Sequence, residues 1–215
     1  APSVMEFIDG KTMRCVCEYK RLDGLDDDSS YLFVEIDGSV SEVGAQRRLL
    51  ENLCIENDIQ IRTASSEDER EYLWELRRAV SPSLARRGIT KVNEDVSLPV
   101  GRLEEAVSFI QAAASELSLD CYIFGHCGDG NLHVNIMTDR RRTEEMERVA
   151  IFVERLFTRV VRLGGTLSGE HGIGMTKSRY LSFRFSPAEL ELQGRVRATL
   201  DGDGLLNPGK YFIRG

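Results

Sequence analysis

Two short apolar runs around a glycine-rich turn restrict the fold of this chain most strongly. The runs CYIFG (121–125) and LHVNIM (132–137) have the composition of β-strands, and they flank the segment HCGDGN. Asp-Gly and Gly-Asn steps supply the positive-φ residues that a tight hairpin connection needs. We therefore expect the chain to fold back on itself here and to contain an antiparallel sheet.

The remaining segments alternate between strand and helix patterns. Strands are predicted at residues 4–9, 31–37, 59–64 and 91–100. Helices are predicted at residues 41–57, 65–80, 102–117, 143–163 and 187–200. The fourth carries an apolar stripe at helical spacing, and Ser186 with Glu189 forms a capping box at the start of the last. Segment 10–22 fits a helix or a strand, and we favour a helix. Ser81-Pro82 is expected to stop the helix before it, and one more strand is expected after residue 163. This order predicts an α+β fold of duplicated ferredoxin-like halves, with a largely antiparallel sheet covered by helices.

Composition excludes some function classes. The net charge of −7 provides no basic surplus to neutralise phosphates, which argues against nucleic acid as a partner. Apolar runs fall short of the roughly 20 residues of a transmembrane helix. The five cysteines form no C-x-x-C pair and indicate a reducing compartment, so we expect the cytoplasm of a bacterium or the mitochondrial matrix of a eukaryote. The start APSVMEFIDG lacks the pattern of a secretory signal and suggests a fragment or processed product.

All three histidines lie in two glycine-rich stretches, GHCGDGNLH (125–133) and SGEHGIG (168–174). The hairpin brings His126 and His133 to the same end of a strand pair, where two imidazoles suit one metal ion. Asn135 shares a strand face with His133, because side chains alternate along a strand. Glu170 supplies a carboxylate, and a His₂-carboxylate set leaves open positions on zinc, iron or manganese. His171 cannot easily point the same way as Glu170, which favours a role in proton transfer.

Taken singly, each of these histidines is better explained as a structural residue in an ordinary turn. Their joint occurrence with glycine on both sides favours the metal site. Two other functions remain open from the residues alone. One is a non-catalytic divalent-metal-binding interaction module. The other is a zinc hydrolase, although no H-E-x-x-H helix and no nucleophile elbow is present.

The motifs GHCGDGNLHVNI, GGTLSGEHGIG and LNPGKYF, in that order, resemble the C-terminal domain of FAD-linked oxidases of the vanillyl-alcohol-oxidase superfamily. The segments VMEFID, FVEIDG, LWELRRAV and EDVSLPVGRL extend the resemblance over nearly all of residues 1–215. The resemblance implies a substrate- and metal-binding cap domain. It also implies that the N-terminal FAD-binding domain lies outside this chain, through truncation or on a partner chain, and that this chain alone is inactive.

The resemblance also assigns residues. It implies a divalent metal, with zinc as the first candidate, held by His126, His133 and Glu170. It implies substrate contacts from Asn135, Arg77, Ser81 and Lys91, with Arg78 as a rival to Arg77. It further implies that His171 is the catalytic residue and that Asn207 and Lys210 approach the flavin.

The implied reaction is the oxidation of a D-2-hydroxy acid of the 2-hydroxyglutarate, lactate or glycolate type to a 2-keto acid. The resemblance implies that the metal would polarise the 2-hydroxyl, that His171 would take its proton and that FAD would accept the hydride. Arg77 would hold a substrate carboxylate, with a solvated helix charge as the alternative interpretation. The sequence leaves open the exact acid, the electron acceptor and the oligomeric state, a homodimer included.

Overall fold

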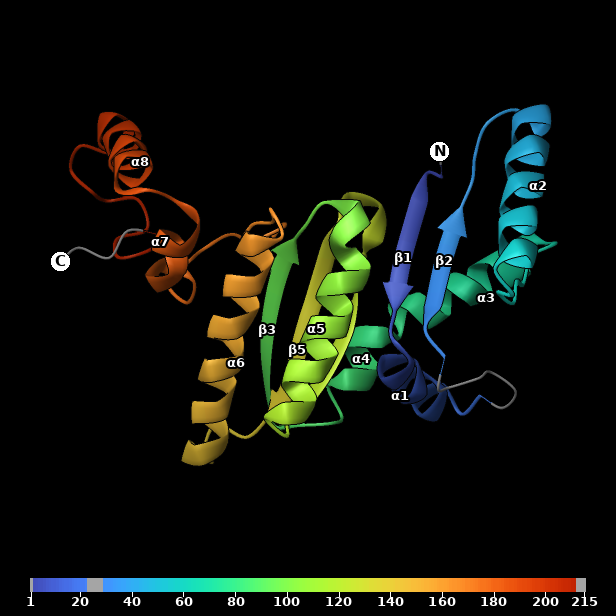
Figure 1. Cartoon of the computed structure of the whole chain (residues 1–215), viewed down its shortest axis with the longest axis horizontal. Coiled ribbons are helices and arrows are strands. Elements are labelled where there is room, and N and C mark those ends of the chain that lie inside the picture. Colours follow the sequence, from blue (N-terminus) through green and yellow to red (C-terminus); the bar gives the residue numbers. More distant parts are fainter. Residues whose placement is uncertain (1, 23–28, 212–215) are drawn as a thin grey trace. The chain divides into compact units, whose positions relative to one another are not determined.

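The computed structural model describes residues 2–22 and 29–211, which divide into two compact units (Figure 1). The first unit contains the described residues up to position 89 together with residues 122–128. The second contains residues 90–121 and those from 129 onward. The residues of the expected site are therefore distributed over both units.

Three strands form the sheet of the first unit. Strand β1 (Val4–Ile8) pairs antiparallel with β2 (Tyr31–Glu35) on one side and with β4 (Asp120–His126) on the other. In this register Glu6 lies directly opposite His126. A buried carboxylate of the first strand is thus placed beside a predicted metal ligand.

Helices complete the first unit. Its helices are α1 (Gly10–Lys20), α2 (Val40–Glu56), α3 (Glu67–Arg78) and α4 (Val80–Leu84). Helix α1 begins at Asp9, whose side chain accepts a hydrogen bond of 2.8 Å from the Thr12 N–H, as an N-cap should. It buries Met13 and Val16 and contacts α4. The preference for a helix over residues 10–22 is therefore confirmed.

The second unit is built on a two-stranded ribbon. Strands β3 (Thr90–Ser97) and β5 (Asn131–Thr138) pair antiparallel over their full lengths, which places Asp95 opposite His133 and Asn93 opposite Asn135. Helices α5 (Leu103–Glu116) and α6 (Thr143–Arg162) lie alongside this ribbon and contact each other (Figure 1). The apolar stripe of α6 is buried as its periodicity predicts: Val149, Val153, Leu156 and Val160.

The C-terminal part of the second unit is helical. Helices α7 (Leu181–Arg184) and α8 (Pro187–Leu200) follow a long loop. Helix α8 begins with the predicted capping box of Ser186 and Glu189. Neither α8 nor α2 buries any residue among the described parts of the chain. No described helix is both long and apolar enough to cross a bilayer.

These elements confirm the α+β class with antiparallel strands, and they correct three details. Segment 59–64 is not a strand: Ile59 and Ile61 are 58% and 49% exposed, and alternation of side chains makes no strand without a hydrogen-bonding partner. The strand expected after α6 is reduced to one bridge between Thr166 and Ser97. Pro82 lies inside α4, in the first turn, where its missing N–H needs no helical acceptor.

Candidate metal and substrate site

A buried carboxylate anchors the SGEHG loop in the second unit. Asp95, fully buried on β3, accepts four hydrogen bonds on Oδ2: from the Ser168 hydroxyl and from the backbone N–H groups of residues 169, 170 and 171, at 2.8–2.9 Å. Burial alone would raise the pKa of Asp95. The N–H groups of His171 and Glu170 and the Ser168 hydroxyl outweigh it and lower this pKa to about 2. The loop donors therefore favour the ionised form of Asp95.

The anchored loop brings three predicted residues together. His133 is 5% exposed on β5, and its Nε2 lies 3.4 Å from Glu170 Oε1. His171 Nε2 lies 3.6 Å from the same oxygen, and its ring stacks on that of His133 with centroids 5.3 Å apart. The expectation that His171 points away from Glu170 is therefore wrong, because the tight loop turns both side chains toward one region.

This donor set fits a divalent cation. Two donors bound tetrahedrally at about 2.1 Å from one ion are about 3.4 Å apart. The His133–Glu170 separation equals this value without any movement. Glu170 and His171 are about half exposed, so ligand or solvent can reach them. The second unit thus offers an imidazole and a carboxylate at metal-binding distance, with a second imidazole beside them.

A buried lysine supports the same loop from the other face of β3. The Lys177 ammonium donates to the backbone carbonyls of Asp95 at 2.8 Å and of Leu167 at 2.9 Å, and it lies 3.7 Å from Glu94 Oε2. Burial lowers the pKa of Lys177 and raises that of Glu94, and the attraction between the two opposes both shifts. Lys177 thus fixes the start of the loop to the strand that carries Asp95.

In the first unit, one carboxylate bridges two predicted site residues. Glu6, 6% exposed, receives a hydrogen bond of 2.7 Å from Arg77 Nε and lies 2.5 Å from His126 Nδ1. The guanidinium of Arg77 also lies over the Phe124 ring, 5.1 Å from its centroid. Arg77 is therefore held in one orientation by a buried partner, and is not a solvated helix charge.

Glu6→Gln is expected to lower the free energy of unfolding by about 2–3 kcal/mol, because it leaves the Arg77 guanidinium, 14% exposed, without a counterion. Chemical denaturation measures the change. The matched control is Glu75→Gln, which removes an exposed pair with Lys20 and should cost less than about 1 kcal/mol. Equal small effects from both substitutions would show that the buried Glu6–Arg77 pair stabilises the fold no more than an exposed pair does.

The other predicted residues occupy varied positions. Asn135 is completely buried and accepts a hydrogen bond of 3.0 Å from Asn93, while Lys91 is exposed farther along the same face of β3. Ser81 is exposed on α4 in the first unit. Arg78, the rival of Arg77, is exposed and pairs with Glu71. Within the second unit, Asn135 and Lys91 thus share the ribbon face of His133.

The two residues expected to approach the flavin lie in one exposed turn. Lys210 Nζ donates to Asn207 Oδ1 at 3.1 Å, and Asn207 has a positive φ of 46°. The next residue, Tyr211, donates its N–H to the Gly174 carbonyl at 2.9 Å. The turn is therefore attached to the end of the SGEHGIG loop.

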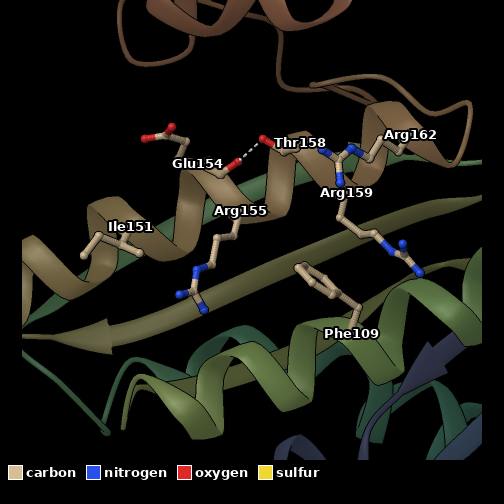
Figure 2. Close-up of a pocket in the computed structure, with 7 residues that line it drawn as sticks. All are labelled: Phe109, Ile151, Glu154, Arg155, Thr158, Arg159 and Arg162. Carbon is tan, nitrogen blue, oxygen red and sulfur yellow. Dashed lines mark hydrogen bonds between the residues drawn. The ribbon is translucent and has the colours of Figure 1, made fainter.

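An open groove between α5 and α6, about 520 Å³ in volume, contains none of the predicted residues (Figure 2). Two of the arginines that line it, Arg155 and Arg159, point from α6 toward α5 (Figure 2). Arg155 pairs with Glu116 and Arg159 with Glu105, so these two cations are already neutralised. This groove therefore gives no support for a binding site.

Sequence reasoning missed three residues: Glu6, Asp95 and Lys177. Asp95 did carry a signal, because Glu94 and Asp95 are adjacent acids inside a predicted strand and must face opposite sides of it. Two buried carboxylates on opposite faces require hydrogen-bond donors on both sides. Glu6 and Lys177 gave no such signal, since a single charge in a strand or in a loop is usually solvated.

Comparisons with known proteins decide the family. Residues 1–211 match the family model of the C-terminal domain of FAD linked oxidases. The chain belongs to this family. It is 33% identical to glycolate oxidase subunit GlcD of Bacillus subtilis over 99% of this chain and 46% of that protein. It is 34% identical to D-2-hydroxyglutarate dehydrogenase of Stutzerimonas stutzeri over 85% of this chain and 40% of that protein.

The fold agrees with the family assignment. The chain resembles a crystal structure of p-cresol methylhydroxylase with a TM-score of 0.69 at 11% identity, covering 98% of this chain and 46% of the other. At this identity the likeness concerns the fold alone. The chain of this FAD-linked oxidase domain spans less than half the length of the relatives named here.

Proposed function

We propose that this chain is the substrate- and metal-binding part of a flavin-dependent dehydrogenase that oxidises a D-2-hydroxy acid to a 2-keto acid. One observation carries the proposal: His133 Nε2 and Glu170 Oε1 lie 3.4 Å apart with His171 stacked beside them, in a chain of the FAD-linked oxidase family. Relatives named for glycolate, D-2-hydroxyglutarate and D-lactate support this substrate class.

The proposed ligands of a divalent metal, zinc as the first candidate, are His133, Glu170 and His126. The pairing of His126 Nδ1 with Glu6 supports the third ligand, because a carboxylate on one ring nitrogen keeps the proton there and leaves Nε2 basic. The bound ion would supply Lewis-acid polarisation of the substrate 2-hydroxyl. Three protein ligands leave a position for the substrate.

His171 is the proposed proton acceptor, since its half-exposed ring stands beside Glu170 at the proposed metal position. Arg77, held by Glu6, is proposed to bind a substrate carboxylate, with further contacts from Ser81, Lys91 and Asn135. Bound FAD, held mainly by a separate FAD-binding domain and approached by Asn207 and Lys210, would supply the hydride acceptor.

Anaerobic titration of the FAD-loaded protein, with its FAD-binding domain, tests the proposal. We expect D-2-hydroxyglutarate, D-lactate or glycolate to bleach the oxidised-flavin absorbance with formation of the matching 2-keto acid. L-lactate serves as the stereochemical control. Zinc binding without flavin reduction by any of these acids would instead support the non-catalytic metal-binding module and end the dehydrogenase proposal.

The division of roles between His126 and His171 has its own test. His126→Ala should lose bound metal, whereas His171→Ala should keep it and reduce flavin about 10²- to 10⁴-fold more slowly, the usual contribution of a general base. Elemental analysis and stopped-flow absorbance measure the two effects. This test matters because His171 Nε2 lies as near to Glu170 as a ligand would. If His171→Ala loses the metal and His126→Ala keeps it, the roles are exchanged.

A further inference from the structure

We propose that Asp95 is a positioning residue that orients two parts of the metal site at once, the SGEHG loop through one oxygen and the His133 ring through the other. The proposal rests on the proposed function, because it concerns the same metal. Asp95 lies within the second unit together with the loop and His133.

The Oδ2 atom fixes the loop. Three consecutive N–H groups, those of Gly169, Glu170 and His171, converge on it together with the Ser168 hydroxyl. Consecutive N–H groups directed at one anion form a concave nest that holds the backbone in a single conformation. This backbone fixes the points at which the Glu170 and His171 side chains leave the loop. The loop backbone therefore cannot move these two residues without breaking bonds to Asp95.

The packing around Gly169 shows how closely the loop approaches this carboxylate. A Cβ atom added to Gly169 would lie 2.9 Å from Asp95 Oδ1 and 2.3 Å from Asn131 Nδ2. Real Cβ atoms essentially never approach heavy atoms so closely, so any other residue here would force the Asn131 or Asp95 side chain to shift. Gly169 thus allows the close approach of the loop to Asp95.

The Oδ1 atom faces His133. It is buried, accepts no hydrogen bond from another described residue, and lies 3.9 Å from His133 Nδ1, on the facing strand. This separation is too long for a hydrogen bond, but the negative charge on this side of the imidazole favours the tautomer that carries its proton on Nδ1. That tautomer presents the lone pair of Nε2, the atom nearest Glu170. In this proposal Asp95 determines that His133 binds the ion through Nε2, and it positions the loop that carries the Glu170 carboxylate.

Direct ligation by Asp95 is the main alternative, since Asp95, His133 and His171 also have ligand atoms within 4.8 Å of one another. The hydrogen bonds argue against it. Oδ2 already accepts four of them, and Oδ1 faces the Nδ1 side of His133 and not the Nε2 side that meets Glu170. A metal held by Asp95 would meet Nδ1 of His133 and leave the Nε2–Glu170 pair unused.

Asp95→Asn tests the proposal in the FAD-loaded protein. If the Asn oxygen takes the loop donors, its NH₂ group faces His133 and favours a proton on Nε2 in place of Nδ1. We expect zinc affinity, measured by chelator competition, to fall about 10- to 100-fold, as for other changes behind metal ligands. Nitrogen-15 NMR of metal-free protein should show the His133 proton moving from Nδ1 to Nε2, which a merely structural role would not produce.

Two further variants keep the test decisive. Asp129→Asn, an exposed acid in the neighbouring turn, removes the same charge and should leave zinc affinity and the His133 tautomer unchanged. Ser168→Ala removes one loop donor without touching His133, and should weaken zinc binding by about fivefold with the tautomer unchanged. This variant tests the contact with the loop if Asp95→Asn does not fold.

The outcomes distinguish the positioning role of Asp95 from the proposed function. Wild-type protein that binds zinc, with unchanged affinity and tautomer in Asp95→Asn, would overturn the positioning role and leave the proposed function standing. Loss of zinc from Asp95→Asn as complete as from His133→Ala would make Asp95 a ligand, which also overturns it. Wild-type protein that binds no zinc and oxidises no D-2-hydroxy acid would instead remove the proposed function.

Discussion

The FAD-loaded protein with His133 changed to alanine is expected to lose its metal and, with it, oxidation of 2-hydroxy acids. His133 is the buried imidazole of the candidate site, and its Nε2 lies 3.4 Å from Glu170. Removing a ligand should cost more than the roughly 10- to 100-fold in affinity that changes behind a ligand cost. We therefore expect zinc affinity to fall more than about 100-fold. Elemental analysis after dialysis measures the metal, and flavin bleaching measures the reaction.

The matched control is Thr138→Val on the same strand. This change removes a hydrogen bond of 2.7 Å to Glu145 and should cost about 1 kcal/mol of stability with the metal retained. It separates a weakened β5 from a lost ligand. Full metal content in His133→Ala would refute the proposed site directly, whatever the effect on activity.

Among glycine-to-alanine substitutions in the hairpin turn, Gly130→Ala is expected to be the most destabilising. Gly130 has a φ of +73°, and a Cβ there would lie 1.9 Å from the Leu98 backbone oxygen. A strained φ costs about 1–3 kcal/mol and overpacking about as much again. We expect the free energy of unfolding to fall by about 4 kcal/mol, measured by urea denaturation followed by circular dichroism.

Gly128→Ala, two residues earlier in the same turn, is the control. Its nearest contact would be the Met5 Cβ at 3.4 Å, an ordinary van der Waals distance, and its φ is not positive. We expect a loss below about 1 kcal/mol. Comparable losses from the two substitutions would mean that the turn relaxes around the added methyl and that the close approach to Leu98 is not a constraint.

Local features of the fold followed from the sequence because local chemistry causes them. The capping box of Ser186 with Glu189, the buried stripe of α6 and both strands beside the glycine-rich turn lie where predicted. Segment 59–64 failed for the complementary reason. Apolar and polar residues do alternate in this segment. A strand also needs a neighbouring strand to hydrogen-bond with, and alternation does not show whether one is present.

The part of the candidate site that lies in the two glycine-rich stretches could be predicted, because histidines flanked by glycine are a recognisable pattern. Its supports could not, because they come from distant positions: Glu6 meets Arg77 across 71 residues, and Asp95 meets the His171 N–H across 76. The direction of His171 also escaped prediction. It depends on how Asp95 holds the loop backbone, which neighbouring residues alone do not determine.

The two adjacent acids of β3 have a consequence for how the chain tolerates change. Glu94 meets the Lys177 ammonium on one face, and Asp95 meets the loop donors on the other. Sliding β3 by one residue against β5 would exchange these faces, offering the longer acid to the donor nest and the shorter one to the lysine. Insertions or deletions before Thr90 must therefore be absorbed ahead of the strand. Only one register of β3 against β5 places both Glu94 and Asp95 beside their partners. The geometry of the candidate site therefore depends on this register.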